Sequence, residues 1–314
     1  MSLPQEPPPS QRQPQRVAIT GASGLIGGAL SAFLTERGDQ VVHLVRREPR
    51  TQYEVGWDPQ TRSLDPHDLS GLAAIVHLAG AGVGDHRWTS SYKKQILASR
   101  VNGTATIAAA LADLGEPVGL VSGSAIGAYG DRGDEVLTED AETGEGFLAD
   151  VVRAWEAATI PAREVGLRVV HARTGIVLAR AGGAIQRLLP LAKLGLAGPL
   201  GTGRQYWSWI TLQDEIRALA HLIDNQDLAG PVNLVSPQPM RQVEIMKALG
   251  KELGRPAVLP VPALALKVAL GELAGDILAS ARILPSVLTA SGFAFEHDTI
   301  ESAMRWLADQ TSGT

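Results

Sequence analysis

The stretch Thr20-Gly21-Ala22-Ser23-Gly24-Leu25-Ile26-Gly27 decides the fold of this chain. It follows the apolar run 17–19, which is typical of a buried strand, and leads into the run 25–37, which predicts a helix that ends at Gly38. Glycines at this spacing let the backbone turn sharply, let a pyrophosphate approach and let the helix pack closely on the strand. The N–H groups at the start of such a helix bind phosphate. The stretch therefore predicts a Rossmann βαβ unit that binds a dinucleotide through Gly21, Ser23, Gly24, Leu25, Ile26 and Gly27.

Short β-branched runs alternate with longer Ala- and Leu-rich runs on either side of this stretch. Strands are predicted at 17–19, 41–45, 53–57, 73–78, 118–122 and 167–172, and later helices at 92–114 and about 147–165. This alternation predicts an α/β fold with a Rossmann-type, doubly wound parallel sheet that is covered by helices on both faces.

The same pattern divides the chain into three parts. Residues 1–15 are rich in Pro, Gln and Ser and are expected to form a disordered tail. Residues 16–180 form the nucleotide-binding domain, and a segment near 212–240 returns to it because the run 232–235 predicts another strand. Residues 181–211 and 241–314 remain for a smaller C-terminal substrate lobe.

The residues after the second predicted strand indicate which dinucleotide is bound. An NAD-selective site carries Asp or Glu here, about 20 residues past the glycine loop. This chain has Arg46 and Arg47 instead, and a guanidinium pairs with a 2′-phosphate that a carboxylate would repel. A solvated basic pair at a strand end is the alternative. The pattern favours NADP.

Composition excludes several other classes of function. The net charge of −5 comes without a basic stripe, so we expect no nucleic-acid partner. The absence of cysteine excludes disulfides and thiolate chemistry and is consistent with a cytoplasmic protein. The most apolar C-terminal run, 261–274, is too short to span a membrane, which takes about 20 residues. The seven histidines show no pair at metal-ligand spacing, so no metal site is expected.

Two motifs together resemble a known family. The glycine stretch 20–27 and His77-Leu78-Ala79-Gly80 resemble the short-chain dehydrogenase/reductase superfamily in its extended form. Gly56-Trp57-Asp58, the segment 125–131, Trp207-Ser208-Trp209-Ile210 and Gly292-Phe293 are similar to a narrower branch. That branch comprises the atypical epimerase-like proteins, namely the bacterial YfcH proteins and their eukaryotic epimerase-family homologues. The resemblance covers nearly the whole chain and implies a Rossmann sheet of about seven strands, a small C-terminal substrate lobe and NADP(H) as ligand.

The resemblance also implies further cofactor contacts on the adenine side, beside the nicotinamide and on the loop that covers it. These residues are Leu78, Ala79, Gly80, Ser122 and Val177. Extended members read Asn-Val-x-Gly-Thr in the long helix after the fourth strand, where this chain reads Arg100-Val101-Asn102-Gly103-Thr104. Arg100 either reaches a cofactor phosphate or is a surface arginine of that helix.

The catalytic residues are where the chain departs from the family. Active members carry Tyr-x-x-x-Lys on the helix that begins here near Phe147, and the tyrosine acts as acid and base. One register places Leu148 and Val152 at these positions, and a shift by one residue places Phe147 and Val151 there. Neither register supplies a phenol or an amine, so the usual proton relay is absent.

Two hydroxyl groups remain as candidate catalytic residues. Ser124 matches the catalytic Ser or Thr of the superfamily and can hydrogen-bond a carbonyl. Tyr129 is the nearest phenol to the expected nicotinamide site, although an aromatic anchor that packs its loop is the favoured alternative. The acidic run that follows, 131–139, is expected to be solvated.

Two features near the second lobe have structural interpretations. Trp207 and Trp209 share one face at period-two spacing, and either line a substrate pocket or close the core, the latter being favoured. Asp214 is expected to cap the start of a helix.

Two functions from different classes fit these observations. The first is an NADP(H)-dependent, epimerase-like oxidoreductase that acts on a small hydroxyl or carbonyl compound, with proton transfer by a non-standard group or water. The second is a catalytically silent NADP(H)-binding redox sensor or partner-binding module. The oligomeric state stays open, with a homodimer as one hypothesis.

Overall fold

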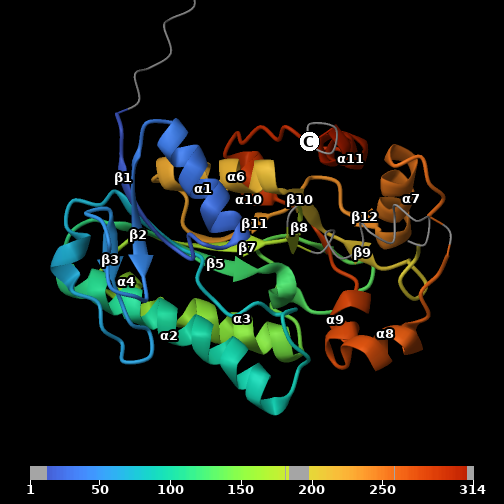
Figure 1. The fold of residues 1–314 in the computed structure, drawn as a ribbon, viewed down its shortest axis with the longest axis horizontal. Coiled ribbons are helices and arrows are strands. Elements are labelled where there is room, and N and C mark those ends of the chain that lie inside the picture. The colour runs from blue at the N-terminus through green and yellow to red at the C-terminus, as the bar shows by residue number, and fades with distance from the viewer. Residues whose placement is uncertain (1–12, 181, 184–197, 258, 310–314) are drawn as a thin grey trace, which may run out of the picture.

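The computed structural model describes residues 13–180, 182–183, 198–257 and 259–309, and its centre is a seven-stranded sheet. The strands follow the order β3-β2-β1-β4-β5-β7-β11, and every neighbouring pair is parallel (Figure 1). They are β1 (Arg16–Thr20), β2 (Gln40–Val45), β3 (Glu54–Gly56), β4 (Ala74–His77), β5 (Gly119–Ala125), β7 (Val169–Thr174) and β11 (Gly230–Leu234). The predicted α/β class and doubly wound parallel sheet are confirmed.

The central strand β1 explains why these residues form a sheet with two covered faces. Val17, Ala18 and Ile19 have no exposed surface, although successive side chains point to opposite faces. Burying an Ile or Val side chain stabilises the fold by about 1.5–3 kcal/mol. Helices must therefore cover both faces of β1.

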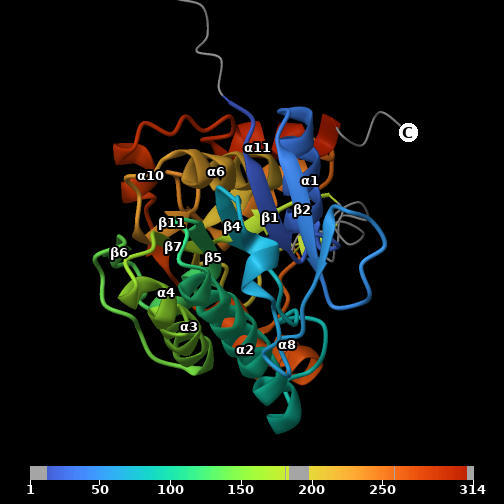
Figure 2. The same ribbon diagram turned by 90° about the vertical axis from the view of Figure 1, so that its left-hand side faces the viewer.

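Two layers of helices provide this cover, as the views in Figures 1 and 2 show. One layer contains α1 (Leu25–Glu36), α6 (Leu212–Asp224) and α10 (Ser286–Ala290), and the other contains α2 (Ser90–Leu114), α3 (Phe147–Ala157) and α4 (Ile160–Glu164). The single helix predicted over about 147–165 is thus two helices. Pro161, in the first turn of α4, cannot donate an intrahelical hydrogen bond, and its ring clashes with the preceding turn of a continuous helix.

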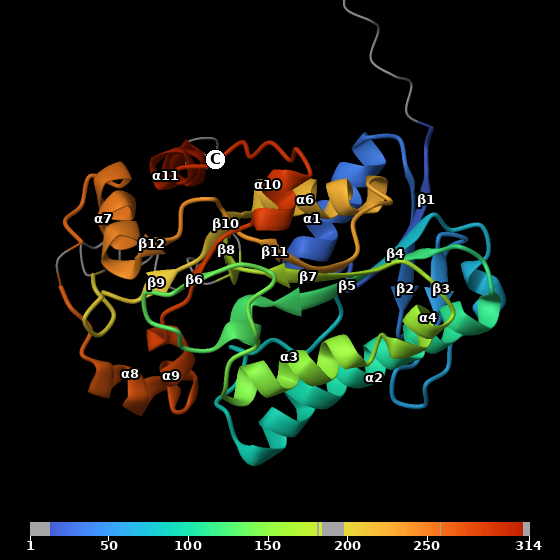
Figure 3. The same ribbon diagram turned by 180° about the vertical axis from the view of Figure 1, so that it is seen from behind.

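The remaining helices lie at the far side of the molecule from β2 and β3 (Figure 3). They are α7 (Gln242–Glu252), α8 (Ala263–Leu270), α9 (Leu273–Leu278) and α11 (Ile300–Asp309). Trp207 and Trp209 are both buried in the apolar cluster of this region. Their indole N–H groups donate to the carbonyls of Ile277 and Gln238, so these side chains close the core, as favoured.

Three short strand pairs lie outside the central sheet in the described part of the chain. They are β8 (Ile176–Leu178) with β10 (Trp209–Thr211), β9 (Tyr206–Trp207) with β12 (Met240–Arg241), and β6 (Val136–Leu137) with β13 (Arg282–Ile283). The strand expected at 232–235 is observed as β11, beside β7. Residues 1–12 of the expected tail and 184–197 of the expected lobe lie outside the described residues.

The sequence predicted that Asp214 caps the start of a helix, but Asp214 does not cap α6. The N-cap is Thr211, whose hydroxyl accepts the backbone N–H of Asp214. The Asp214 carboxylate instead accepts the backbone N–H groups of Glu296 and His297 at 2.8 and 2.9 Å. Asp214 therefore joins α6 to the segment that leads into α11.

Candidate functional site

The glycine loop connects β1 to α1 at the point where the strand order reverses. In open α/β sheets this crevice binds the ligand. Gly21 has a φ of +71°, and a side-chain carbon built on Gly27 would lie 2.3 Å from the Gly21 carbonyl oxygen. Gly24, at the N-cap, offers no side chain to the first-turn N–H groups of α1, and Ser23 beside it is exposed. The loop and the first turn of α1 thus form a tight phosphate cradle.

Thr20, which is not among the cofactor contacts predicted from the sequence, fastens this loop to the end of β4. Its hydroxyl oxygen accepts the backbone N–H groups of Leu78 and Ala79 at 3.0 and 3.1 Å. Its hydrogen therefore goes to His77 Nδ1, 2.8 Å away, and the proton of the neutral ring is on Nε2. Burial and, as a smaller effect, the charge of Arg100 lower the pKa of His77 to about 3, so the ring is neutral.

The close approach of two chain segments brings the predicted adenine-side residues to the glycine loop. A side-chain carbon at Gly21 would lie 3.0 Å from the backbone of Leu78 and Ala79. Gly80 follows, and a side-chain carbon there would lie 3.5 Å from the guanidinium of Arg100. These residues therefore share one site.

Arg100 is not a solvated surface arginine, because its guanidinium donates hydrogen bonds within the protein beside the glycine loop. It is half-buried, and Nη1 donates to the carbonyls of Ala81 and Ile96 at 2.9 and 3.2 Å. Its guanidinium lies 5.0 Å from the Trp155 ring centroid. Arg100 thus places a positive charge under the segment that contains Gly80, which favours an anionic ligand there.

Arg46 and Arg47 follow β2 directly, and their surroundings differ. Arg47 makes a bidentate ion pair with Glu54 of β3, at 2.5 and 2.8 Å. These hydrogen bonds, together with one from the backbone N–H of Arg50, lower the pKa of Glu54 to about 2. Arg46 is exposed, and its guanidinium has no hydrogen bond or ion pair with another described residue. Arg46 is the guanidinium that a ligand could engage without breaking an existing pair.

The two candidate serines of β5 have partners within the protein. Ser122 has no exposed surface, and its hydroxyl donates to the Gly123 carbonyl at 3.2 Å. Ser124 is 5% exposed, and its hydroxyl donates to Glu156 at 2.6 Å. Arg173 holds the same carboxylate with two hydrogen bonds of 2.8 and 2.9 Å. Ser124 therefore belongs to a buried Ser–Glu–Arg cluster.

Tyr129 extends this cluster into the protein interior. Its side chain has no exposed surface. Its hydroxyl accepts from Arg173 at 3.0 Å and donates to Asn233 at 2.8 Å, and burial raises the pKa of the phenol. This arrangement favours the alternative role, an anchor that packs the loop. The acidic run is not fully solvated either, because Glu139 is buried and accepts the backbone N–H of Asn233 at 3.0 Å.

The positions of the missing tyrosine and lysine are filled with apolar side chains. Phe147, Leu148 and Val151 belong to a cluster with Trp88, and Leu148 packs directly against Gly127. The ring centroids of Phe147 and Trp88 are 5.0 Å apart. The start of α3 therefore packs through apolar side chains against Trp88 and Gly127.

One cation near this cluster was not predicted from the sequence. The ammonium of Lys93, in α2, lies 4.9 Å from the Phe147 ring centroid and 2.6 Å from a carboxylate oxygen of Glu272, between α8 and α9. Glu272, the partner of Lys93, is distant in the sequence, so no local pattern predicted that Lys93 would lie beside Phe147.

Val177, in β8, leads into the segment that approaches the glycine loop. A side-chain carbon at Gly182 would lie 3.1 Å from the side chain of Leu25, and one at Gly183 would lie 2.8 Å from the Val177 carbonyl. The covering position expected for this segment is thus next to the start of α1. Its continuation, 184–197, lies outside the described residues.

No group of three or more potential His, Cys, Asp or Glu metal ligands occurs among the described residues. No helix in the described part of the chain is long and apolar enough to cross a membrane.

Comparisons with known proteins agree with this geometry. Residues 17–234 match the NAD dependent epimerase/dehydratase family, and residues 261–307 match a domain of unknown function, DUF1731. Epimerase family protein Mb2239 of Mycobacterium bovis is 44% identical over 289 residues, which are 92% of this chain and 96% of that protein. Epimerase family protein SDR39U1 of Bos taurus is 34% identical over 92% of this chain and 98% of its own.

A solved structure shares the fold over nearly the whole length. The crystal structure of human epimerase family protein SDR39U1 (isoform 2) with NADPH superposes with a TM-score of 0.87 and 29% identity, covering 94% of this chain and 99% of that chain. The family match spans more than half of this chain, from β1 to the end of β11. The glycine loop, the sheet order and these matches together show that the chain belongs to the NAD dependent epimerase/dehydratase family.

Proposed function

We propose that this protein binds NADP(H) where β1, β2 and β4 end, and that it is an oxidoreductase of the epimerase type. The observation that carries cofactor binding is the contact of Gly27 with the Gly21 carbonyl, which leaves no room for a side chain. This contact sets the free first-turn N–H groups of α1 against the loop, where they fit a pyrophosphate. The NADPH in the human SDR39U1 structure supports the same cofactor here.

The choice of NADP(H) over NAD(H) rests on Arg46. Its guanidinium is exposed and unpaired among the described residues, whereas Arg47 is already held by Glu54. A 2′-phosphate paired with Arg46 would gain a charge-assisted hydrogen bond worth about 1.5–3 kcal/mol.

Calorimetry on Arg46→Gln tests this assignment. We expect the wild type to bind NADPH more tightly than NADH, and the variant to lose about 10- to 150-fold in NADPH affinity with little change for NADH. Arg305→Gln, on the exposed side of α11, is the matched control and should behave as the wild type. Equal affinity of the wild type for both cofactors would contradict the proposal.

The proposed substrate is a small compound that carries a hydroxyl or carbonyl group. Bound NADP(H) would supply or accept the hydride. Ser124 donates its own hydrogen to Glu156 and keeps its lone pairs. A substrate hydroxyl could therefore donate to Ser124 while the serine proton passes to Glu156, and Arg173 would hold the carboxylate in place.

A catalytically silent NADP(H)-binding sensor is the second candidate. The observation that favours it is the packing of Phe147 and Leu148 where the family carries its tyrosine, together with the burial of Ser124 and Tyr129. These features leave few polar groups for a reacting substrate.

NADPH oxidation against a panel of aldehydes and ketones separates the two candidates. Turnover by the wild type supports the oxidoreductase, and Ser124→Ala should then lower kcat by about 10²-fold or more, with recovery in Ser124→Thr. NADPH affinity should stay unchanged in both variants. Turnover by Ser124→Ala at the wild-type rate would rule out the serine relay, and no turnover with any compound would favour the sensor.

A further inference from the structure

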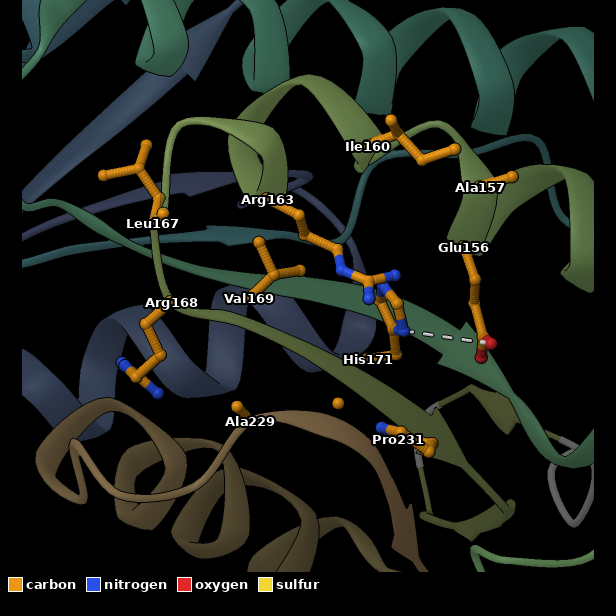
Figure 4. A pocket seen from close by; sticks show the side chains of 12 residues that line it. Glu156, Ala157, Ile160, Arg163, Leu167, Arg168, Val169, His171, Ala229 and Pro231 are labelled. Carbon is orange, nitrogen blue, oxygen red and sulfur yellow. Dashed lines mark ion pairs between the residues drawn. The ribbon is translucent and has the colours of Figure 1, made fainter.

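A cavity of about 550 Å³ opens beside the edge strand, apart from the glycine loop. It lies between the α3–α4 region and strands β7 and β11, which are separated from β1 in the sheet by β4 and β5 (Figure 4). Its volume falls within the range of about 300–1,000 Å³ that is typical of small-molecule sites. The relay proposed above involves one lining residue, Glu156, and none of the other residues that line this cavity.

Two hydrogen-bond acceptors face each other in its lining. The Thr159 hydroxyl donates to the Glu156 backbone carbonyl at 2.7 Å, so it must accept its 3.0 Å hydrogen bond from His171 Nε2. The proton of the neutral imidazole is therefore on Nε2, and Nδ1 carries a lone pair. Nδ1 lies 3.8 Å from Glu156 Oε2, and these two side chains are 8% and 14% exposed.

Near neutral pH, His171 Nδ1 does not donate a hydrogen bond to the Glu156 carboxylate. Burial lowers the pKa of His171, and the charges of Arg173 and Arg163 act in the same direction, although Glu156 opposes them. A neutral ring offers no N–H to the carboxylate. A ligand hydroxyl could point its single hydrogen between the two acceptors and share it with both in a three-centre hydrogen bond, with its oxygen about 2.8–3.0 Å from each.

The charges around the cavity favour an anion. Arg173 already balances the charge of Glu156 through two hydrogen bonds. The Arg163 guanidinium has no hydrogen bond or ion pair within the described ranges, and Figure 4 shows it extending toward His171. Arg168 also lines the cavity, but its Nη1 donates to two backbone carbonyls beyond it. Arg163 thus offers an unpaired guanidinium to the cavity, and Nε and Nη2 of Arg168 are buried without a hydrogen-bond partner among the described residues.

The remaining walls are apolar and include Ile160, Leu167, Val169 and Pro231. We propose that this cavity binds a small aliphatic hydroxy acid. Its hydroxyl lies between His171 Nδ1 and Glu156 Oε2, its carboxylate pairs with Arg163, and its carbon chain contacts the apolar walls. A guanidinium binds a carboxylate through two parallel hydrogen bonds, which suits this arrangement. The proposal does not depend on the cofactor or on any reaction.

The test uses the full chain and three matched probes. 3-Hydroxybutyrate carries the hydroxyl, the charge and the chain, butyrate lacks the hydroxyl, and 1,3-butanediol lacks the charge. Titrations are followed by ¹⁵N NMR of the histidine side chains. We expect saturable binding of 3-hydroxybutyrate with a shift of the His171 Nδ1 resonance, and at least about tenfold weaker binding of each other probe.

Two variants complete the experiment. Arg163→Gln should weaken 3-hydroxybutyrate by at least about tenfold while NADPH affinity stays at the wild-type value, which also shows that the variant is folded. Arg305→Gln, on α11, should leave both affinities unchanged. Equal binding of butyrate, no saturation with 3-hydroxybutyrate, or a shift that spares His171 would each overturn the proposal, whatever the outcome for NADP(H).

Discussion

Glu215, in the first turn of α6, is an acid that the fold keeps out of water. Its side chain has no exposed surface, and one carboxyl oxygen accepts from the Thr174 hydroxyl at 2.8 Å. The other oxygen has no hydrogen-bond partner among the described residues. Burial raises the pKa of Glu215 from 4.5 to about 8, so the folded protein holds it protonated at neutral pH.

This raised pKa makes stability depend on pH. Below pH 4.5 the carboxyl is protonated in both the folded and the unfolded chain, so its ionisation does not lower the free energy of unfolding. Between 4.5 and about 8 it is ionised only in the unfolded chain, so its contribution is lost progressively as pH rises, by at most about 1.4 kcal/mol per pH unit.

Urea unfolding of the wild type and Glu215→Gln at pH 5 and pH 8 measures this effect. The glutamine keeps the size of the side chain but does not ionise, so the variant should gain stability relative to the wild type as pH rises. Glu301→Gln, on the exposed side of α11, should follow the wild type at both values. A difference between Glu215→Gln and the wild type that stays the same at both pH values would contradict the assignment.

At the scale of elements, the close contact between the glycine loop and α1 can be tested with two Gly→Ala substitutions in helices. One creates a steric clash, and the other changes only the helix propensity. A side-chain carbon at Gly27 would lie 2.3 Å from the Gly21 carbonyl oxygen, so Gly27→Ala must move α1 away from the loop. We expect a stability loss of about 1–3 kcal/mol and weaker NADPH binding. Gly275→Ala, in α9, has no heavy atom within 4 Å of the new carbon and should be neutral or stabilising by about 0.5–1 kcal/mol. Thermal unfolding and NADPH titration of both variants give the comparison, and unchanged NADPH affinity in Gly27→Ala would argue against the phosphate cradle.

The sequence predicted those helices and strands whose signals lie within a few neighbouring residues. The glycine spacing of 21–27 and the apolar run of β1 identified the βαβ unit, because both constraints act within a few residues. The two-residue strands β6 and β13 were not predicted, since Val136 pairs with Arg282, far along the chain. The break between α3 and α4 was missed although Pro161 marks it.

The candidate site shows the same division. The glycine loop and the 78–80 segment were predicted from the sequence, and the structure brings them together. The pairing of Ser124 with Glu156 was not predicted, because its geometry depends on how α3 packs against β5. The same holds for Arg173, which reaches Glu156 from β7. Contacts between elements that are distant in sequence leave no periodic signal.

At the scale of the whole molecule, a buried carboxylate ties the segment before α11 to the layer of helices that covers the central sheet. Asp214 has no exposed surface, and its two oxygens accept the backbone N–H groups of Glu296 and His297 and a hydrogen bond of 2.9 Å from Arg217. These bonds hold the segment before α11 against α6, which itself packs on α1. Asp214 is therefore one of the groups that hold the segment before α11, together with Ser236, whose hydroxyl donates to the Asp298 carbonyl at 3.1 Å.

Hydrogen exchange on Asp214→Ala tests this connection. The change removes the acceptor for two backbone N–H groups, each worth about 1–3 kcal/mol when left unsatisfied in a buried setting, and less here because Glu296 is exposed. We therefore expect faster exchange across residues 296–309 and a moderately lower Tm, while the amides of β1, β4 and β5 keep their protection. Asp113→Ala, at an exposed position of α2, should change neither quantity. If exchange rose equally over the central sheet, Asp214 would stabilise the whole fold rather than the joint between the sheet and α11. If residues 296–309 kept their wild-type exchange, the apolar contacts of α11 with α7 would be what holds this helix in place.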